Sequence, residues 1–251
     1  METILEKISI ITPYFETKKM LEKQLEVWHS YPSELKSQIE FVIIDDGSPE
    51  NPAGIKFCNL NLILARVDIN IPWNHPGAQN LGAYLATSSW IWSGGIDHVF
   101  TSENMYKLTK LDRKDLKVNY KIPRRSIKQD KLIGYHWEIN YLAKKTFWSI
   151  GGYDEDFSGI WGSDDVCFTS MLKKSGVREI KLEDIFLDLY TEDDFKDANT
   201  HRYTDKVGWG PRKMNPINRS LWLAKVAGKI PYGQNPLRFP WKIEKTFTYV
   251  K

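Results

Sequence analysis

Five carboxylates fall at three places where their type and spacing could support chemistry. Asp45 and Asp46 directly follow a short apolar run, and Asp97 follows another apolar run through two glycines. Asp164 and Asp165 stand side by side behind a glycine-rich stretch. Carboxylates can accept hydrogen bonds from a base or a ribose, hold a divalent cation, or take a proton from a hydroxyl group. They also cap helices and hold turns, so each place has a plain structural reading as well.

The pair Asp164–Asp165 lies where a helix is expected to begin, after Ser163, and Gly176 would end that helix. Negative charge is stabilised at a helix N-terminus, so we expect such a carboxylate to stay ionised at neutral pH, as a general base must. Glycines and aromatic residues precede the pair and predict an aromatic-lined approach to it. The candidate residues on this approach are Gly151, Gly152, Tyr153 and Trp161.

The elements that would position these side chains can be predicted from hydrophobic patterning. Short apolar runs at 8–12, 41–44, 60–67 and 90–93 are typical of strands buried on both faces. Helices are expected between them, one beginning at Lys18 after Thr17 and one opened by Pro76; the segment from 199 onward is expected to be mostly irregular.

This alternation of strands and helices predicts an α/β fold with a mostly parallel, doubly wound sheet. Ligands bind at the carboxyl ends of the strands in such sheets. The polar clusters at 14–16, 45–48 and 95–98 all lie at predicted strand ends. We therefore expect one ligand site at this edge of the sheet.

Length and composition limit the other possibilities. The chain has 251 residues, a net charge of +3 and only two cysteines, Cys58 and Cys167. We expect one domain, a reducing cytoplasmic location, no disulfide framework and no transmembrane segment. Nucleotide-binding GxxxxGK[ST] and GxGxxG, the GxSxG elbow and HExxH are absent from the sequence. These absences argue against the hydrolase and protease classes that carry such motifs.

Two further features have a structural and a functional interpretation. The stretch 113–131 carries eight Lys or Arg and two Asp, a net +6. It is either a solvated loop, which we favour, or a flap that faces an anion. His201 lies in a polar stretch and is either an ordinary histidine or a metal ligand.

Taken in order, several segments resemble the family-2 glycosyltransferases with a GT-A fold, of the small type found in phages and bacteria. The segments are ISIITPYFE, FVIIDDGS, WNHPGAQNLGAYLATSSWIW, GGIDH at the place of a DxD motif, IGGYDEDFSGIWGSDD and the closing LRFPW. The resemblance implies one GT-A domain over 1–251, with a nucleotide-sugar half (1–100), an acceptor half (101–198) and a C-terminal extension (199–251).

The resemblance also implies roles for individual residues. Asp165 would be the general base of an inverting transfer, with Asp164 as the alternative. Asp97 would hold Mn²⁺ or Mg²⁺, and His201 would complete that site. The donor contacts would be Thr12, Pro13, Tyr14, Glu16, Asp45, Asp46, Gln79, Asn80, Gly95 and Ile96. The acceptor contacts would be the four aromatic and glycine residues named above, with a glycan or another hydroxyl compound as the acceptor.

Two residues depart from the family pattern. Gly95 occupies the first position of the expected DxD motif, and Gln79 stands where the family often has an arginine. Both departures remove charge from the donor diphosphate site. The chain would then use Asp97 together with His98 or His201, use basic residues of 113–131 in place of a metal, or be an inactive relative.

Two alternatives to a glycan transferase stay open at this point. A catalytically degenerate protein of the same fold would bind a nucleotide or a glycan and catalyse nothing. A phage-type transferase would place a sugar on modified DNA bases, and the basic stretch 113–131 motivates that alternative.

Overall fold

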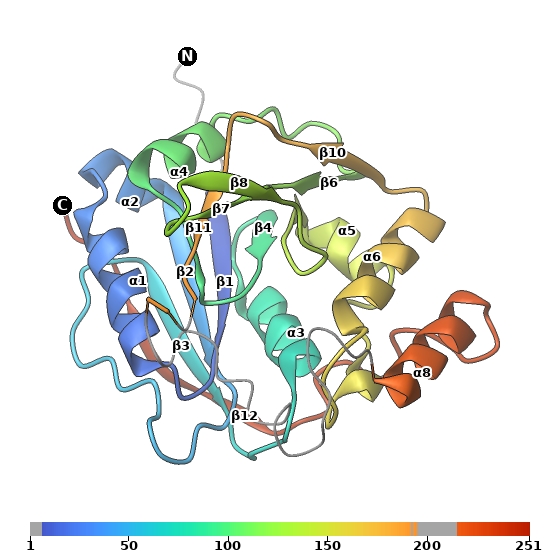
Figure 1. The fold of residues 1–251 in the computed structure, drawn as a ribbon. Coiled ribbons are helices and arrows are strands. Elements are labelled where there is room, and N and C mark those ends of the chain that lie inside the picture. Colours follow the sequence, from blue (N-terminus) through green and yellow to red (C-terminus); the bar gives the residue numbers. More distant parts are fainter. Residues whose placement is uncertain (1–6, 192, 195–214) are drawn as a thin grey trace.

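The computed structural model describes residues 7–191, 193–194 and 215–251. Its centre is an eight-stranded sheet with the order β10-β6-β9-β4-β1-β2-β3-β12 (Figure 1). The strands are β1 (Ile8–Tyr14), β2 (Ile39–Asp45), β3 (Leu62–Val67), β4 (Trp90–Ser93), β6 (Val118–Lys121), β9 (Asn140–Ala143), β10 (Arg178–Lys181) and β12 (Trp241–Phe247).

The four strands predicted from the apolar runs form the parallel part of this sheet. β4, β1, β2 and β3 are neighbours and all run in the same direction. Alternate residues of β1 and β2 enter two different cores: Ile10 and Phe41 on one face, Ile11 and Val42 on the other. Burial on both faces explains why these strands appear as continuous apolar runs. The predicted α/β fold class is confirmed.

Helices cover both faces of the sheet. Apolar residues of α1 (Lys18–Ser30), α2 (Ser33–Gln38) and α4 (Ser102–Thr109) belong to one core, and those of α3 (His75–Leu85), α5 (Lys144–Ser149) and α6 (Asp164–Lys174) to the other. α1 and α6 begin where predicted, but the side chains of Thr17 and Ser163 make no cap hydrogen bond. Among the described residues, none of the helices has the length and apolar character that a bilayer span needs.

A second, four-stranded sheet has the order β5-β11-β7-β8. Its strands are β5 (His98–Val99), β7 (Arg124–Ser126), β8 (Lys131–Gly134) and β11 (Leu187–Leu189). Figure 1 shows β7 and β8 in front of the central strands. β5 begins directly after Asp97, so this small sheet starts at the carboxyl end of β4.

The C-terminal part is more regular than the sequence predicts. It contains α8 (Pro216–Val226), which packs against α6, and β12, which pairs antiparallel with β3 at the edge of the central sheet. Most side chains of β12 are exposed, Lys242 and Lys245 among them. A charged edge strand has no buried face, so hydrophobic patterning cannot reveal it.

Candidate active site

The two aspartates at the end of β2 have different environments. Asp45 is fully buried, and its carboxylate accepts hydrogen bonds from the backbone N–H of Ser48 (2.9 Å) and Ala53 (3.0 Å) and from Nη1 of Arg66 (2.6 Å). These three bonds hold the loop after β2. Asp46 is bonded by Asn74, whose Nδ2 donates to it (2.9 Å), and burial raises its pKa to about 7. Of the two, Asp46 keeps acceptor capacity for a ligand.

The residues at the end of β1 support the same loop. Glu16 accepts hydrogen bonds from the backbone N–H of Glu50 (2.8 Å) and Asn51 (2.9 Å). Its backbone has a φ of 57°, which is uncommon for a residue with a side chain. Thr12 and Tyr14 are buried beneath the site, whereas Pro13 is half-buried. This strand therefore supplies mainly the support for the loop 46–53.

The end of β4 leads into the segment Gly95–Asp97, which stands at the place of a DxD motif but has glycine in the first position. Asp97 is partly exposed, and its Oδ1 lies 2.9 Å from Nδ1 of the buried His98. Burial opposes the charged form of His98, but Asp97 outweighs that effect and raises the pKa of the imidazole. Ile96 is buried, and its carbonyl accepts a hydrogen bond from Gln24. Gly95 is half-buried beside these groups.

His75, the first residue of α3, joins the two sides of the site. Its Nδ1 lies 2.6 Å from Oδ2 of Asp164, and its Nε2 lies 3.5 Å from Oε1 of Glu138. Gln79, one turn further along α3, lies 3.1 Å from Nε2 of His75 and accepts a hydrogen bond from Ser93. Gln79 therefore lies beside a histidine in this structure, where the family pattern has an arginine near the donor.

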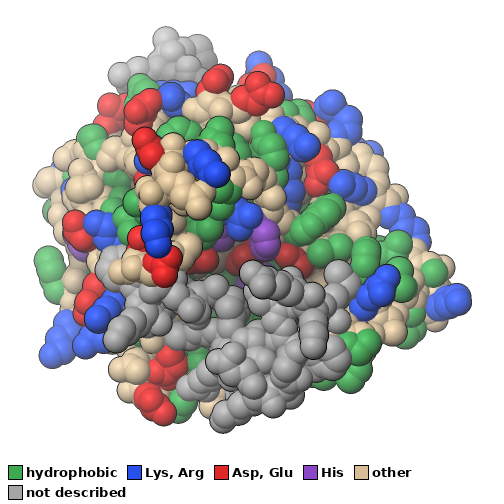
Figure 2. Space-filling model, in the orientation of Figure 1, with side chains coloured by type: hydrophobic (Ala, Val, Ile, Leu, Met, Phe, Trp, Pro, Cys, Tyr) green, Lys and Arg blue, Asp and Glu red, His purple; other side chains and the backbone are tan. Residues whose placement is uncertain are grey.

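Charges in this cluster compensate each other. Burial would lower the pKa of His75, but the bonds to Asp164 and Glu138 overcome it and raise that pKa well above its usual value. Burial would likewise raise the pKa of Glu138, yet His75, His98 and His136 hold it well below the usual range. An imidazolium between two carboxylates is thus the dominant form at neutral pH. Figure 2 shows histidine and acidic side chains gathered at the centre of this face.

Asp165 differs from its neighbour because, among the residues that the structure describes, no basic side chain bonds to it. Its Oδ1 accepts a hydrogen bond from the backbone N–H of Val166 (2.7 Å). Burial raises the pKa of Asp165 to about 7, and the charges of Asp164 and Glu138 act in the same direction. The expectation that this carboxylate is fully ionised at neutral pH is therefore wrong, because desolvation outweighs the helix dipole. A pKa near neutrality suits a general base.

Of the four predicted acceptor contacts, Gly152 and Tyr153 are buried and Gly151 is half-buried. Tyr153 is fully buried and stacks on Phe168 with ring centroids 4.1 Å apart. A Cβ atom at Gly151 would lie 2.6 Å from the carbonyl oxygen of Gly233, and one at Gly152 would lie 2.4 Å from Oδ1 of Asn80. These three residues pack closely against their neighbours, and none of them presents a side chain to an acceptor.

Trp161 is the exception among those four. It is half-buried and meets Trp73 edge to face, with ring centroids 6.3 Å apart. Trp73 in turn lies 5.9 Å from the ring of His75. The two indoles therefore form an aromatic wall next to the His75–Asp164 pair. Aromatic faces of this kind can stack on a sugar ring.

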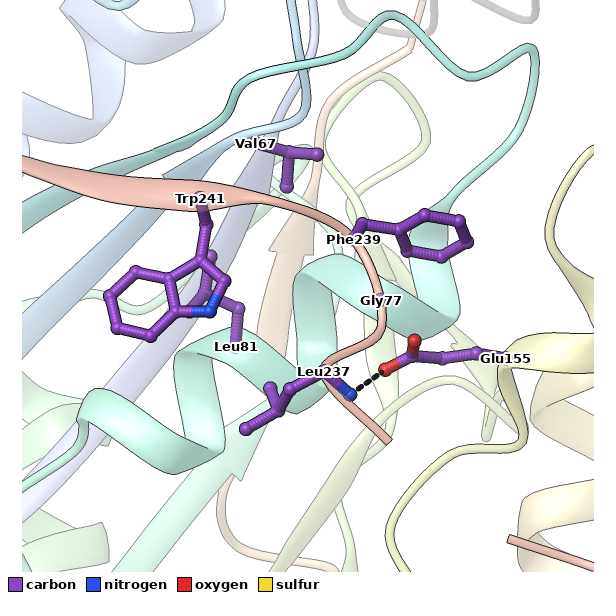
Figure 3. Close-up of a pocket in the computed structure, with 7 residues that line it drawn as sticks. All are labelled: Val67, Gly77, Leu81, Glu155, Leu237, Phe239 and Trp241. Atoms are coloured by element: carbon purple, nitrogen blue, oxygen red, sulfur yellow. Dashed lines mark hydrogen bonds between the residues drawn. The ribbon is translucent and has the colours of Figure 1, made fainter. Parts of the chain in front are cut away.

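The segment around Glu155 ties the C-terminal part to α3. Glu155 accepts hydrogen bonds from Nδ2 of Asn80 (2.8 Å) and from the backbone N–H of Leu237 (2.7 Å). Figure 3 shows Glu155 and Leu237 at a small pocket that Trp241 and Phe239 also line. Asn80 is fully buried and bonds to Tyr153 as well. Its role here is to join segments of the chain, beneath the surface that a donor would touch.

Part of the basic stretch 113–131 is paired or buried. Arg125 pairs with Asp188 (2.7 Å), Lys128 pairs with Asp193 (2.8 Å), and Lys121 is buried. Arg124 is half-buried, and the carboxylates of Asp97 and Glu138 act on its pKa, which burial lowers. One guanidinium of the stretch thus faces the site.

His201 lies outside the described residues. Within the described part of the chain, no three His, Cys, Asp or Glu side chains come together as a metal site.

Sequence reasoning missed Trp73, His75, His136 and Glu138. The available signals were the WNHP segment before α3 and the HWE segment between β8 and β9, where polar residues interrupt apolar ones. Neither segment matches a general motif, and their side chains meet only through the folding of distant segments.

Comparisons with solved structures support the architecture. Staphylococcus aureus TarS 1–349 in complex with UDP superposes with a TM-score of 0.60 and 15% identity, over 89% of this chain and 71% of that one. The mannosyltransferase PcManGT from Pyrobaculum calidifontis, in complex with GDP-Man and Mn²⁺, gives 0.56 and 15%, over 89% and 70%. In a further TarS 1–349 structure the match covers only 63% of that chain. No model of a protein family and no curated protein matches the sequence.

The chain therefore has the fold of the GT-A glycosyltransferases. The predicted fold is confirmed, and the structural matches agree with the resemblance found in the sequence. At 14–15% identity these matches show the fold alone. The chemistry has to be argued from the side chains of this chain.

Proposed function

We propose that the chain is an inverting glycosyltransferase that moves a sugar from a nucleoside-diphosphate sugar to an acceptor hydroxyl group. The observation that carries this proposal is the environment of Asp165, a carboxylate with a pKa of about 7 next to the His75–Asp164 pair. Glu138 connects that pair to the end of β4. A base and a donor site would thus share one cluster, as a direct transfer requires.

In this mechanism Asp165 takes the proton of the acceptor hydroxyl as its oxygen attacks the anomeric carbon. The nucleoside diphosphate leaves from the opposite side of the sugar. Asp164 is bound to His75 and serves to hold the imidazolium in place. Asp46 accepts hydrogen bonds from the nucleoside, and Trp161 with Trp73 stacks on the acceptor. The acceptor class we propose is a glycan or another hydroxyl compound.

Asp97 is the carboxylate that would hold a divalent cation. It offers hard oxygen ligands at a partly exposed position beside Gly95. Mg²⁺ and Mn²⁺ at phosphate sites take one or two carboxylates and complete their shell with phosphate oxygens and water, so this position fits such an ion. When bound, the cation would neutralise charge on the leaving diphosphate. His201 remains a proposed second ligand.

Nucleotide binding provides the direct test of the donor site. We expect one nucleoside diphosphate, offered with Mn²⁺, to raise the melting temperature of the protein, because a ligand that binds only the folded state stabilises it. Asp46→Asn should reduce that shift, whereas the exposed Asp115→Asn should leave it unchanged. A panel of UDP, GDP, CDP and ADP with Mn²⁺ or with a chelator is the measurement. No shift with any of them would contradict the proposal.

The pH dependence of turnover should report on Asp165. A general base acts only when deprotonated, so we expect kcat/KM to rise with pH up to about 7 and to level off above it. An exposed carboxylate would give the same rise near pH 4. The measurement is kcat/KM against pH with the donor identified above. A profile that is flat between pH 5 and 8 would remove Asp165 as the base.

A catalytically inactive binding protein of the same fold is the alternative that Gly95 and Gln79 motivate. It would show the nucleotide shift and no slow hydrolysis of the sugar donor. For a DNA acceptor no observation adds support, because ion pairs and burial account for much of the basic stretch.

A further inference from the structure

Glu138 lies where the missing carboxylate of the β4 segment would be. A Cβ atom built at Gly95 would be 2.8 Å from Oε1 of Glu138 and 2.5 Å from Oδ1 of Asp97. The carboxylate of Glu138 therefore occupies the space into which a side chain at residue 95 would project. Residue 138 is 43 positions further along the chain, so the sequence alone does not suggest this substitution.

We infer that Glu138 replaces the absent side chain of residue 95 and binds, together with Asp97, the divalent cation of the donor site. This inference rests on the proposed function, since it concerns the cation that would accompany the donor diphosphate. Mg²⁺ or Mn²⁺ at a phosphate site takes one or two carboxylates from the protein, so Glu138 would be the second of the pair.

The position of Glu138 is held by several contacts. Nζ of Lys121 is buried and bonds to the carbonyl oxygens of Trp137 (3.0 Å) and Ile139 (2.8 Å), on either side of Glu138. Nδ2 of Asn140 donates to the carbonyl oxygen of Glu138 (2.9 Å). A buried lysine and an amide thus fix the backbone of this residue beside the end of β4.

The side chain of Glu138 is oriented but keeps capacity for a cation. Its Oε1 lies 3.5 Å from Nε2 of His75, and its Oε2 lies 3.8 Å from Nδ1 of His136. A carboxylate offers about four lone-pair positions, so two such contacts leave room for a metal ion. Histidines that orient a ligating carboxylate are a common outer layer of metal sites.

A second, independent observation points to the same place. His98 is 3% exposed, and its Nε2 has no hydrogen-bond partner within the described residues. Its Nδ1 lies 3.3 Å from the Cβ point of Gly95, so the ring borders the same space. Through Nδ1 this buried imidazole contacts Asp97, so a third group able to bind or orient a ligand lies at the edge of the space between the two carboxylates.

The test removes the carboxylate of residue 138, places one at residue 95 instead, and measures the binding of Mn²⁺ to each variant. Free Mn²⁺ is followed by electron paramagnetic resonance, alone and with UDP or GDP, in the unmodified full chain and in variants. We expect Glu138→Gln to weaken Mn²⁺ binding by about tenfold or more, as removal of a ligand should. Glu103→Gln is the matched control: the Glu103 side chain is 75% exposed, so this variant should bind Mn²⁺ as the unmodified chain does.

Moving the carboxylate from residue 138 to residue 95 tests the inference more stringently than removing it. Gly95→Asp alone should not improve Mn²⁺ binding, because its Cβ would crowd both existing carboxylates. Gly95→Asp combined with Glu138→Ala should recover binding to within about threefold of the unmodified chain, since one carboxylate again fills the space. Melting temperatures of all variants show whether they fold.

Two results would overturn the inference: Mn²⁺ binding that is unchanged in Glu138→Gln but lost in Asp97→Asn, or a folded double variant that does not recover binding. Absence of Mn²⁺ binding to the unmodified chain, with and without nucleotide, would also overturn it. None of these three results touches the transfer proposal, which is judged by the nucleotide shift in chelator and by donor turnover.

Discussion

Replacement of Asp165 by asparagine is expected to lower kcat by about 10²–10⁴-fold, the usual contribution of a general base. Asparagine has nearly the same shape and keeps an oxygen that can accept the hydrogen bond from Val166. It cannot take a proton from an acceptor hydroxyl. Nucleotide affinity should stay within about twofold of the unmodified protein, because donor binding is assigned to the strand ends. Single-turnover rates and nucleotide thermal shifts measure the two effects separately.

Asp164→Asn is the informative companion variant. Asp164 is bonded to His75, so its neutralisation should disturb the imidazolium and its contact with Glu138, with a smaller loss of kcat than Asp165→Asn. Asp115→Asn, at an exposed ion pair with Arg178, should be silent. Full activity in both Asp164→Asn and Asp165→Asn would exclude a base at this helix. A larger loss in Asp164→Asn would transfer the role to Asp164.

The stability of Asp165→Asn adds a readout that does not depend on activity. The pKa of Asp165 is raised to about 7 in the folded chain, above the value of about 4 for an unfolded one. Ionisation therefore opposes folding: the cost is absent below pH 4, grows as pH rises, and is complete above about 7. Asn removes this cost, so the variant should melt a few degrees higher at pH 8 and close to the unmodified protein at pH 4.

The parallel core could be predicted because its signal is local. β1, β2 and β4 are buried on both faces, so each is a continuous apolar run in the sequence. The polar residues that follow these strands had to meet at one edge of the sheet. β12 gave no such signal, because an exposed edge strand alternates charged residues with few apolar ones.

The individual roles within the site could not be predicted in this way. Asp45 and Asp46 are adjacent and chemically identical, yet Arg66 and two backbone N–H groups use the acceptor capacity of Asp45 alone. Asp164 and Asp165 likewise differ in one long-range contact, the bond between Asp164 and His75. Sequence spacing places a carboxylate at an edge or on a helix. Its protonation and free lone pairs depend on partners from distant segments.

Our inference for Glu138 would make the loss of a carboxylate at Gly95 less damaging than the sequence alone suggests. A motif is a linear pattern, whereas a ligand needs only an oxygen atom at the right point in space. Glu138 reaches the space beside Gly95 from the segment before β9. Its orientation depends on Lys121 and Asn140, which also come from the central sheet.

Loss of Lys225 should have the largest effect on stability. Its Nζ lies 2.6 Å from Oδ2 of Asp154 and 2.6 Å from Oδ2 of Asp156, and the side chains of Lys225 and Asp154 are fully buried. Lys225→Met would leave the carboxylate of Asp154 buried without a counter-ion. Breaking such a pair costs about 3–5 kcal/mol, which for a chain of this size lowers the melting temperature by roughly 6–20 °C. Thermal unfolding at pH 7 measures it.

The double variant Lys225→Met with Asp154→Asn separates charge from packing. Asparagine removes the unpaired charge and keeps one oxygen, which can accept the hydrogen bond from the N–H of Asp156 but not also that from Gly233, so part of the lost stability should return. Lys128→Met, at the exposed ion pair with Asp193, is the matched control and should leave the melting temperature nearly unchanged. If Lys225→Met melted like Lys128→Met, the buried pair would not hold α8 to the segment that leads into α6. The position of Asp165 would then have to depend on the contacts of α6 with the sheet alone.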